Sequence, residues 1–223
     1  MIQEELFTAI KTQFNSKLPF VGYRHPNDAY LKAILQQDNI IHTVNDFTES
    51  GFVFSPFDSK QDAILLPLEQ SNTISCEYLF SSEISINQGS SPKRKEYNTS
   101  KDGHDYHFKL VEKGIKAIHD GRFEKVVLSR VERVPISEEN PIDIFKTLLD
   151  TYPAAYVYIW YHPQIGLWLG ATPETLLNTE GQRFKTMSLA GTKKHDKRID
   201  VPWGTKEIHE QQIVTDFIVN SLK

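Results

Sequence analysis

Three short segments of this sequence carry residues that could do acid–base chemistry. The first, Phe123–Arg130, sets Lys125 among strand-forming residues. The second, Gly170–Glu174, ends in a glutamate that follows an apolar run and a proline. The third, Leu189–Thr192, precedes a helix start that carries two further glutamates. A basic group, an acidic group and a metal-type carboxylate together indicate proton transfer on a small anionic substrate.

Each of these residues also has a plain structural explanation. A lysine entering a strand, such as Lys125, often lies along the surface with its amine in water. Glu174 is compatible with an exposed turn, and residues 190–192 are compatible with an ordinary bend between elements. Glu207 and Glu210 can complement the positive N-terminus of their helix. The residue types alone therefore leave the function open.

The composition is that of a globular protein with one sizeable core. The chain has 223 residues, of which 39% are hydrophobic and 24% are charged. Its net charge of -4 argues against general nucleic-acid binding, which usually requires a basic excess. Cys76 is the single cysteine, which excludes an intrachain disulfide and fits a reducing compartment.

The sequence also lacks signals for export or membrane insertion. Its first residues have neither the basic start nor the apolar core of a signal peptide. No apolar run approaches the length that crosses a bilayer. We therefore expect a cytoplasmic protein without a membrane or nucleic-acid partner.

Hydrophobic spacing and turn residues predict a mixture of helices and strands without strict alternation, so the expected fold class is α+β. Amphipathic spacing predicts helices over 2–16, about 108–118, 141–149 and from about 205 onward. The helix marked by Phe108 and Ile115 should face the core. Apolar runs predict strands within 18–80 and at 124–134, 155–161 and 166–169, with a hairpin at 175–178 and 183–188. Polar residues predict a loop over 86–103.

In their order and wording, the motifs resemble those of the chorismate-utilising enzymes, and among them the isochorismate synthases. The resemblance rests on four segments: Lys125–Arg130, Gly170–Glu174, Leu189–Thr192 and Glu207–Glu210. It is specific over 108–223 and loose over 1–100. It implies a single domain over 1–223, built as a mostly antiparallel sheet packed with helices. Members of this family continue well past this length, so the resemblance also implies the N-terminal portion of a protein truncated at its C-terminus.

The resemblance assigns catalytic roles to Lys125 and Glu174. Lys125 would be the base that takes a proton from water, which requires that desolvation or nearby positive charge keep its amine neutral. Several family members have glutamine at this position and use ammonia, so lysine points to water as the nucleophile and isochorismate as the product. Relatives that form salicylate or aminodeoxychorismate also carry a lysine. Glu174 would protonate the departing hydroxyl from a dry pocket.

The resemblance further implies Mg²⁺ bound by Glu210, with Glu207 as a second candidate ligand. The substrate chorismate would lie against the turn of Ala190, Gly191 and Thr192. The missing portion normally supplies a second metal-binding glutamate and further substrate-binding segments, so we expect negligible turnover by the 223-residue chain alone. Apolar surface left uncovered would favour self-association.

Two alternatives stay open at this point. One is a salicylate synthase or another chorismate-utilising enzyme. The other is a non-catalytic module that keeps the fold and only binds a ligand or a partner.

Overall fold

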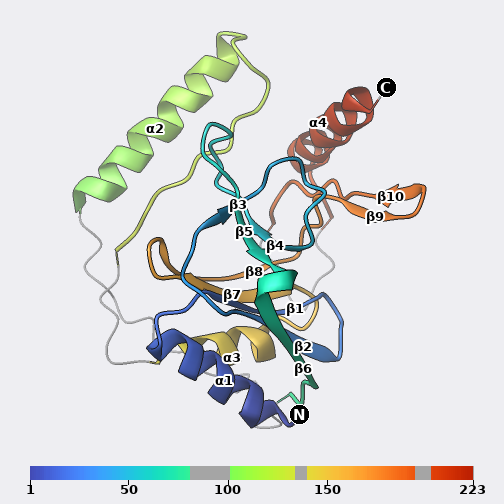
Figure 1. The fold of residues 1–223 in the computed structure, drawn as a ribbon. Coiled ribbons are helices and arrows are strands. Elements are labelled where there is room, and N and C mark those ends of the chain that lie inside the picture. The colour runs from blue at the N-terminus through green and yellow to red at the C-terminus, as the bar shows by residue number, and fades with distance from the viewer. Residues whose placement is uncertain (81–100, 134–139, 194–201, 223) are drawn as a thin grey trace. The chain divides into compact units, whose positions relative to one another are not determined.

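The computed structural model describes residues 1–80, 101–133, 140–193 and 202–222 (Figure 1). The chain divides into two compact units. Unit 1 comprises Met1–Gln88 and Glu138–Glu174, and unit 2 comprises Gly89–Ser137 and Thr175–Lys223. The two units are described separately below.

Unit 1 is built on a five-stranded antiparallel sheet with the strand order β6-β2-β1-β7-β8. The strands are β1 (Phe20–Arg24), β2 (Tyr30–Gln36), β6 (Ser71–Glu77), β7 (Tyr156–His162) and β8 (Gly166–Thr172). The central strand β1 joins the N-terminal hairpin to the later β7–β8 hairpin, because Val21 lies opposite both Ile34 and Trp160. The sheet therefore unites segments that are far apart in the sequence.

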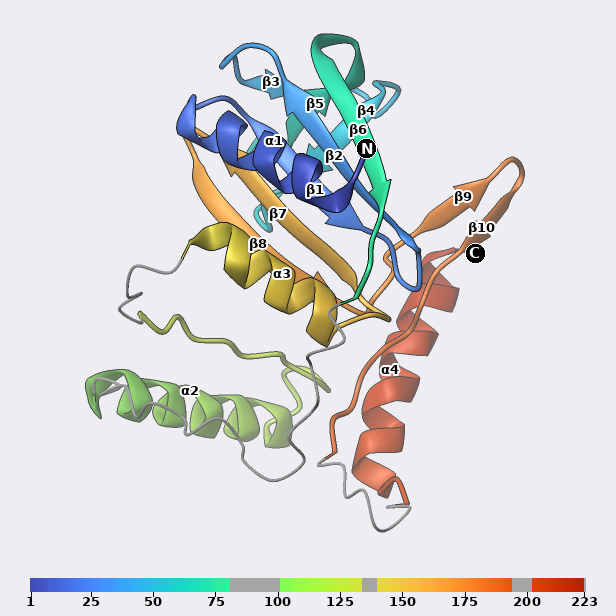
Figure 2. The same ribbon diagram turned by 90° about the horizontal axis from the view of Figure 1, so that it is seen from below.

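Helices α1 (Gln3–Asn15) and α3 (Pro141–Thr151) cover one face of this sheet (Figures 1 and 2). Leu6 and Ile10 of α1 and Phe145 of α3 are fully buried in the core beneath them. The start of α3 is fixed by Asn140, whose Oδ1 accepts a hydrogen bond from the Ile142 amide at 3.1 Å. Such a cap followed by proline is a sequence-level signal for a helix start, and it explains why this helix was predictable.

A small three-stranded sheet covers the other face. Its order is β3-β5-β4, with β3 at His42–Thr43, β4 at Gly51–Phe54 and β5 at Ile64–Pro67, and the short 3₁₀ helix η1 (Leu68–Gln70) leads on to β6. Phe54 stacks on the buried Trp160 with ring centroids 4.4 Å apart. Because both faces are covered, β1 and β7 carry buried side chains on both sides.

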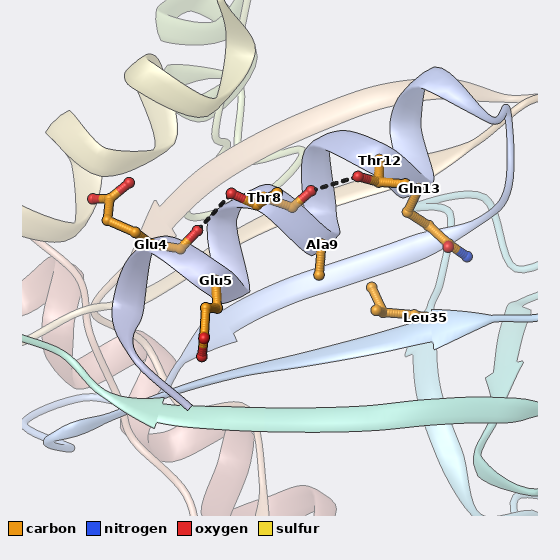
Figure 3. A pocket seen from close by; sticks show the side chains of 7 residues that line it. All are labelled: Glu4, Glu5, Thr8, Ala9, Thr12, Gln13 and Leu35. Atoms are coloured by element: carbon orange, nitrogen blue, oxygen red, sulfur yellow. Dashed lines mark hydrogen bonds between the residues drawn. The ribbon is translucent and has the colours of Figure 1, made fainter.

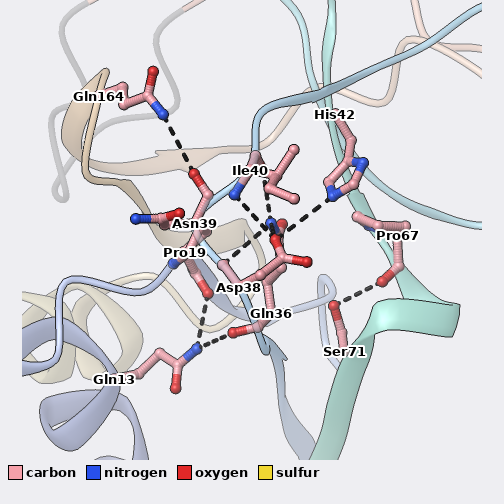
Figure 4. Close-up of polar contacts among 10 residues, drawn as sticks. All are labelled: Gln13, Pro19, Gln36, Asp38, Asn39, Ile40, His42, Pro67, Ser71 and Gln164. Carbon is pink, nitrogen blue, oxygen red and sulfur yellow. Dashed lines mark hydrogen bonds and ion pairs between the residues drawn. The ribbon is translucent and has the colours of Figure 1, made fainter.

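Polar side chains tie the end of α1 to the sheet (Figure 4). The Gln13 amide donates to the carbonyls of Pro19, at 3.1 Å, and Gln36, at 2.5 Å. The buried Gln36 amide in turn donates to Asp38 Oδ1 and to the Ile40 carbonyl, each at 2.8 Å. These bonds satisfy backbone carbonyls where strands end, which buried backbone requires.

Unit 2 contains α2 (Lys101–His119), the hairpin strands β9 (Asn178–Glu180) and β10 (Arg183–Lys185), and α4 (Thr205–Ser221). Among the described residues, every hydrophobic side chain in the buried core belongs to unit 1. In α2, Phe108 is 60% exposed and Ile115 is 53% exposed. The prediction that this helix face packs into a core is therefore wrong for the described chain.

The predicted α+β class, with an antiparallel sheet and helices, is confirmed. The predicted strand at 124–134 is wrong, because its described part, 124–133, forms no strand. Of the predicted loop, residues 86–100 lie outside the described residues and 101–103 belong to α2. Within the described ranges, no helix is long and apolar enough to cross a membrane.

Arg24 links the sheet to the end of α3. Its guanidinium is fully buried, and Nη2 donates to the carbonyls of Leu149, at 3.2 Å, and Tyr152, at 2.9 Å. It also lies 4.9 Å from the ring centroid of Phe80. Burial lowers the pKa of Arg24, while Tyr78 and Asp150 raise it, and an arginine keeps its charge under such shifts. Arg24 thus occupies the last carbonyls of the helix, which have no partner within the helix itself.

Replacing Arg24 with methionine removes both hydrogen bonds and most of the stacking. We expect the free energy of unfolding to fall by about 1.5–3 kcal/mol, the usual worth of hydrogen bonds to a charged group. Urea denaturation followed by circular dichroism measures this change. Lys32→Met is the matched control, because Lys32 is a partly exposed cation in β2, 3.9 Å from Asp28. Equal losses in the two variants would contradict the role given to Arg24.

Candidate active site

The segment that carries Lys125 packs on α2. A Cβ atom added to Gly114 of α2 would lie 3.3 Å from both Val126 Cγ1 and Leu128 Cδ1. Val127, between them, is 81% exposed. Alternate side chains thus face α2 and solvent, as in an extended chain, and this alternation sets Lys125 on the face opposite α2.

Lys125 itself is half-buried. Its neighbours Val126 and Val127 are more exposed than a strand within a sheet would leave them. The desolvation that the apolar neighbours should provide is incomplete, because the segment is not held in a sheet. A strand former gains its stability from pairing and from burial against neighbours, and the described part of this segment pairs with no strand and packs on α2.

Glu174 follows the end of β8 in unit 1. Its backbone amide donates to the hydroxyl of Thr172 at 3.3 Å, across Pro173, which fixes the turn that leaves the strand. The side chain is exposed. The expectation of a dry pocket around Glu174 is therefore not met within the described chain.

The predicted substrate turn lies directly on α4. Gly191 has φ +81°, a conformation that favours glycine, and a Cβ atom there would lie 3.1 Å from the Glu207 carbonyl oxygen. Ala190 is half-buried and Thr192 is exposed. The structure thus brings the turn at 190–192 together with the first turn of the helix that carries both predicted metal ligands.

The two glutamates of α4 differ in their surroundings. Glu207 is the third residue of the helix. A Cβ atom added to Gly204, the N-cap residue, would lie 2.6 Å from Glu207 Oε2. Its carboxylate therefore turns back over the helix start, where negative charge is favourable. Glu210 is 32% exposed, and its Oε1 lies 3.3 Å from Lys206 Nζ. Both glutamates are half-buried.

The two glutamates of α4 supply oxygen donors of the type that magnesium binds. The described residues contain no group of three or more histidine, cysteine or acidic side chains that could hold a metal. Mg²⁺ is commonly bound by one or two carboxylates and completes its shell with water and substrate oxygens. Glu210, with Glu207 one turn before it, fits that requirement. The exposed ion pair to Lys206 is too weak to prevent it.

A group of polar side chains next to this turn was not predicted from the sequence. Ser188 Oγ and Thr215 Oγ1 lie 2.9 Å apart, and the Gln211 amide donates to both hydroxyls. All three side chains are half-buried. Serine, threonine and glutamine are common surface residues, so only their spatial meeting reveals them.

Within unit 2, the structure thus gathers the turn at 190–192, Glu207 and Glu210. Lys125 also belongs to unit 2, whereas Glu174 belongs to unit 1. The pairing of Lys125 with Glu174 stays a prediction from the sequence. The groove of about 510 Å³ along α1 and Leu35 (Figure 3) is lined by none of these residues and lies entirely in unit 1.

Comparison with known families decides the class of protein. A family model described as chorismate binding enzyme matches residues 61–223, which is more than half of the chain. The chain belongs to the chorismate binding enzyme family. The match includes all four motifs and the whole of the described part of unit 2.

Known relatives within this family have different names and activities. The chain is 35% identical to anthranilate synthase component 1 of Thermococcus kodakarensis over 83 residues, covering 37% of this chain and 18% of that protein. It is 32% identical to an isochorismate synthase of Escherichia coli K12 over 111 residues, covering 45% and 28%. A salicylate biosynthesis isochorismate synthase of Pseudomonas aeruginosa is 28% identical over 121 residues, covering 51% and 25%.

The matched segments therefore span less than a third of each of these three relatives. No solved structure matches the chain. The comparisons establish a chorismate-binding enzyme family and leave the particular reaction to be proposed.

Gly191 offers a direct test of the contact between the turn and α4. Gly181, in the β9–β10 hairpin, also has a positive φ, of +59°. Alanine therefore carries a similar backbone cost at either glycine, about 1–2 kcal/mol. Only alanine at Gly191 also meets the Glu207 carbonyl, because the space around Gly181 is open within 4 Å. We expect Gly191→Ala to change backbone amide chemical shifts at 204–208, whereas Gly181→Ala changes them only in the hairpin. Unchanged shifts at 204–208 in Gly191→Ala would refute the contact.

Proposed function

We propose that the chain is part of an isochorismate synthase, which interconverts chorismate and isochorismate with Mg²⁺. The single observation that supports this reaction over anthranilate formation is the lysine at position 125 within a chorismate binding enzyme family. Both isochorismate and anthranilate synthases are similar to the chain, so the identity of this one residue carries the distinction.

Lys125 acts as the base in this proposal. Its neutral amine takes a proton from a water molecule, and the water oxygen forms a new bond to one ring carbon. The half-buried position of Lys125, with Val126 and Leu128 held on α2, limits its motion while leaving the amine accessible to substrate. A glutamine amide could not take this proton, because it is not a base at neutral pH.

Glu174 acts as the acid. Its carboxyl gives a proton to the hydroxyl that leaves from another ring carbon, so that hydroxyl departs as water. Substrate and product have the same composition, since one water adds and one leaves. The enzyme ends with a protonated lysine and an ionised glutamate, and proton exchange with solvent restores both. The Thr172 hydroxyl, which holds the Glu174 amide, fixes the backbone from which this proton is delivered.

Glu210 and the turn at 190–192 hold the substrate. When bound, Mg²⁺ would neutralise a substrate carboxylate and draw electron density toward it. Glu210 is the first candidate ligand, and Glu207 is the second. The backbone of Gly191 and the Thr192 hydroxyl offer donors to a carboxylate, beside the positive end of α4.

Product analysis tests the proposed reaction directly. The complete protein encoded by the gene is incubated with chorismate and Mg²⁺, with and without an ammonium salt, and the products are separated by chromatography. Isochorismate is the expected product. Salicylate with pyruvate would instead indicate the salicylate-forming alternative, anthranilate would indicate amination, and unchanged chorismate would favour a binding module.

Substitution of the two proposed catalytic groups tests their roles. We expect Lys125→Ala and Glu174→Gln each to lower kcat by about 10²–10⁴, the usual contribution of a general acid or base. Steady-state assays of the complete protein measure the change. Lys113→Ala and Glu180→Gln are the controls, because both side chains are exposed and outside the motifs. A near-normal kcat in either catalytic variant would remove that residue from its assigned role.

A further inference from the structure

The contacts between Ser188 and α4 form a closed polar cluster, which we call the turn clamp (Ser188, Gln211 and Thr215). Ser188 Oγ and Thr215 Oγ1 are 2.9 Å apart. The Gln211 amide donates to Ser188 Oγ at 3.3 Å and to Thr215 Oγ1 at 3.0 Å. Thr215 Oγ1 donates to the Gln211 carbonyl at 3.2 Å, within the helix.

The hydrogen atoms of the turn clamp are fully used. The Gln211 amide has two N–H groups, and each meets one hydroxyl. Either hydroxyl can donate in the 2.9 Å contact between Ser188 Oγ and Thr215 Oγ1, because the Gln211 carbonyl lies within reach of both, at 3.5 Å from Ser188 Oγ and 3.2 Å from Thr215 Oγ1. Each hydroxyl thus both donates and accepts, and a cluster satisfied in this way behaves as one unit.

The position of the turn clamp connects it to the proposed site. Ser188 lies two residues before Ala190, where the substrate turn starts. Gln211 follows Glu210 directly and lies one helical turn after Glu207. Together with the Gly191 contact on Glu207, the turn clamp fixes both flanks of the Leu189–Gly191 segment to one helix. A substrate carboxylate at Gly191 and a metal at Glu210 would then be held at a constant spacing.

The surroundings make these few contacts important. In the described part of unit 2, no apolar side chain near the turn clamp is fully buried: Leu189 is 50% exposed, Ile208 is 57% exposed and Val214 is half-buried. Burial of apolar surface therefore fixes this turn only in part, and the hydrogen bonds add to it.

We propose that Ser188, Gln211 and Thr215 are positioning residues that hold the substrate-facing turn at 190–192 against α4. This inference rests on the proposed function, since it assigns the turn to substrate binding. The positioning residues touch neither substrate nor metal. Their loss therefore weakens chorismate binding more than it slows the chemical step.

The test separates KM from kcat in the complete protein encoded by the gene. Ser188→Ala should raise the KM for chorismate about 2–10-fold, the worth of one neutral hydrogen bond. The kcat should change by less than about twofold, because uniform binding is what is lost. The Mg²⁺ concentration for half-maximal activity should stay the same, since Glu210 is untouched. Ser188→Thr keeps the hydroxyl and should restore the KM.

A double-mutant cycle tests whether the turn clamp is one unit. Thr215→Val should raise the KM as Ser188→Ala does. The KM of the double variant should be no higher than that of the more impaired single variant. Ser221→Ala is the matched control, because Ser221 lies on the same helix and bonds only the Phe217 carbonyl, at 2.8 Å. We expect wild-type values for this control.

The outcomes distinguish this inference from the proposed function. An unchanged KM in Ser188→Ala, additive losses in the double variant, or an equal loss in Ser221→Ala would overturn the positioning role. If the wild-type protein binds chorismate but forms a different product, the proposed reaction fails and the KM for chorismate still decides on the turn clamp. If it binds no chorismate, both proposals fail.

Discussion

Unit 1 depends on the close approach of two helices to the middle of its sheet at Gly22. A Cβ atom at this position in β1 would lie 2.8 Å from Ile10 Cδ1 of α1 and 3.4 Å from Phe145 Cε1 of α3. Both of those side chains are fully buried. The absence of a side chain on β1 thus creates the space that α1 and α3 fill, and any side chain there would force the tightly packed core apart. All five strands and both helices contribute side chains to the core cluster on this face of the sheet.

Unit 2 has no comparable core among its described residues. Its helix α2 is amphipathic in sequence, but its apolar face is largely exposed, with Phe108 at 60%, and Phe217 of α4 is 71% exposed. What holds its parts in place is local: two side chains packed on Gly114, one glycine against Glu207, and the turn clamp. Each contact of this kind contributes little free energy. The geometry of unit 2 therefore rests on weaker interactions than that of unit 1.

Sequence reasoning succeeded where local chemistry specifies an element. Pro141 marks the start of α3, and the apolar run at 155–161 marks β7. It failed at 124–133, where strand-forming residues have no strand to pair with in the described chain. β propensity measures fit to a sheet surface and cannot create the sheet. Sequence reasoning also gave no bounds for β2 and β6, because 18–80 was predicted only as a region that contains strands.

The same division applies to the candidate site. The resemblance named the turn at 190–192 and the helix with Glu207 and Glu210, and the structure shows that Gly191 packs against Glu207. The exposure of Glu174 could not be predicted, since burial depends on what the rest of the fold places around a turn. The turn clamp was also out of reach. Ser188 is 23 residues from Gln211 and 27 from Thr215, and hydrogen bonding across such distances follows from the fold alone.

The two parts of the proposed site are therefore supported by different forces. Glu174 follows a strand whose sheet is packed on both faces, so the position of its backbone depends on hydrophobic burial and on the Thr172 hydroxyl. The turn at 190–192 depends on hydrogen bonds that are partly open to solvent. Conditions that weaken hydrophobic burial should thus disturb the backbone at Glu174, whereas loss of a single hydroxyl disturbs the turn at 190–192.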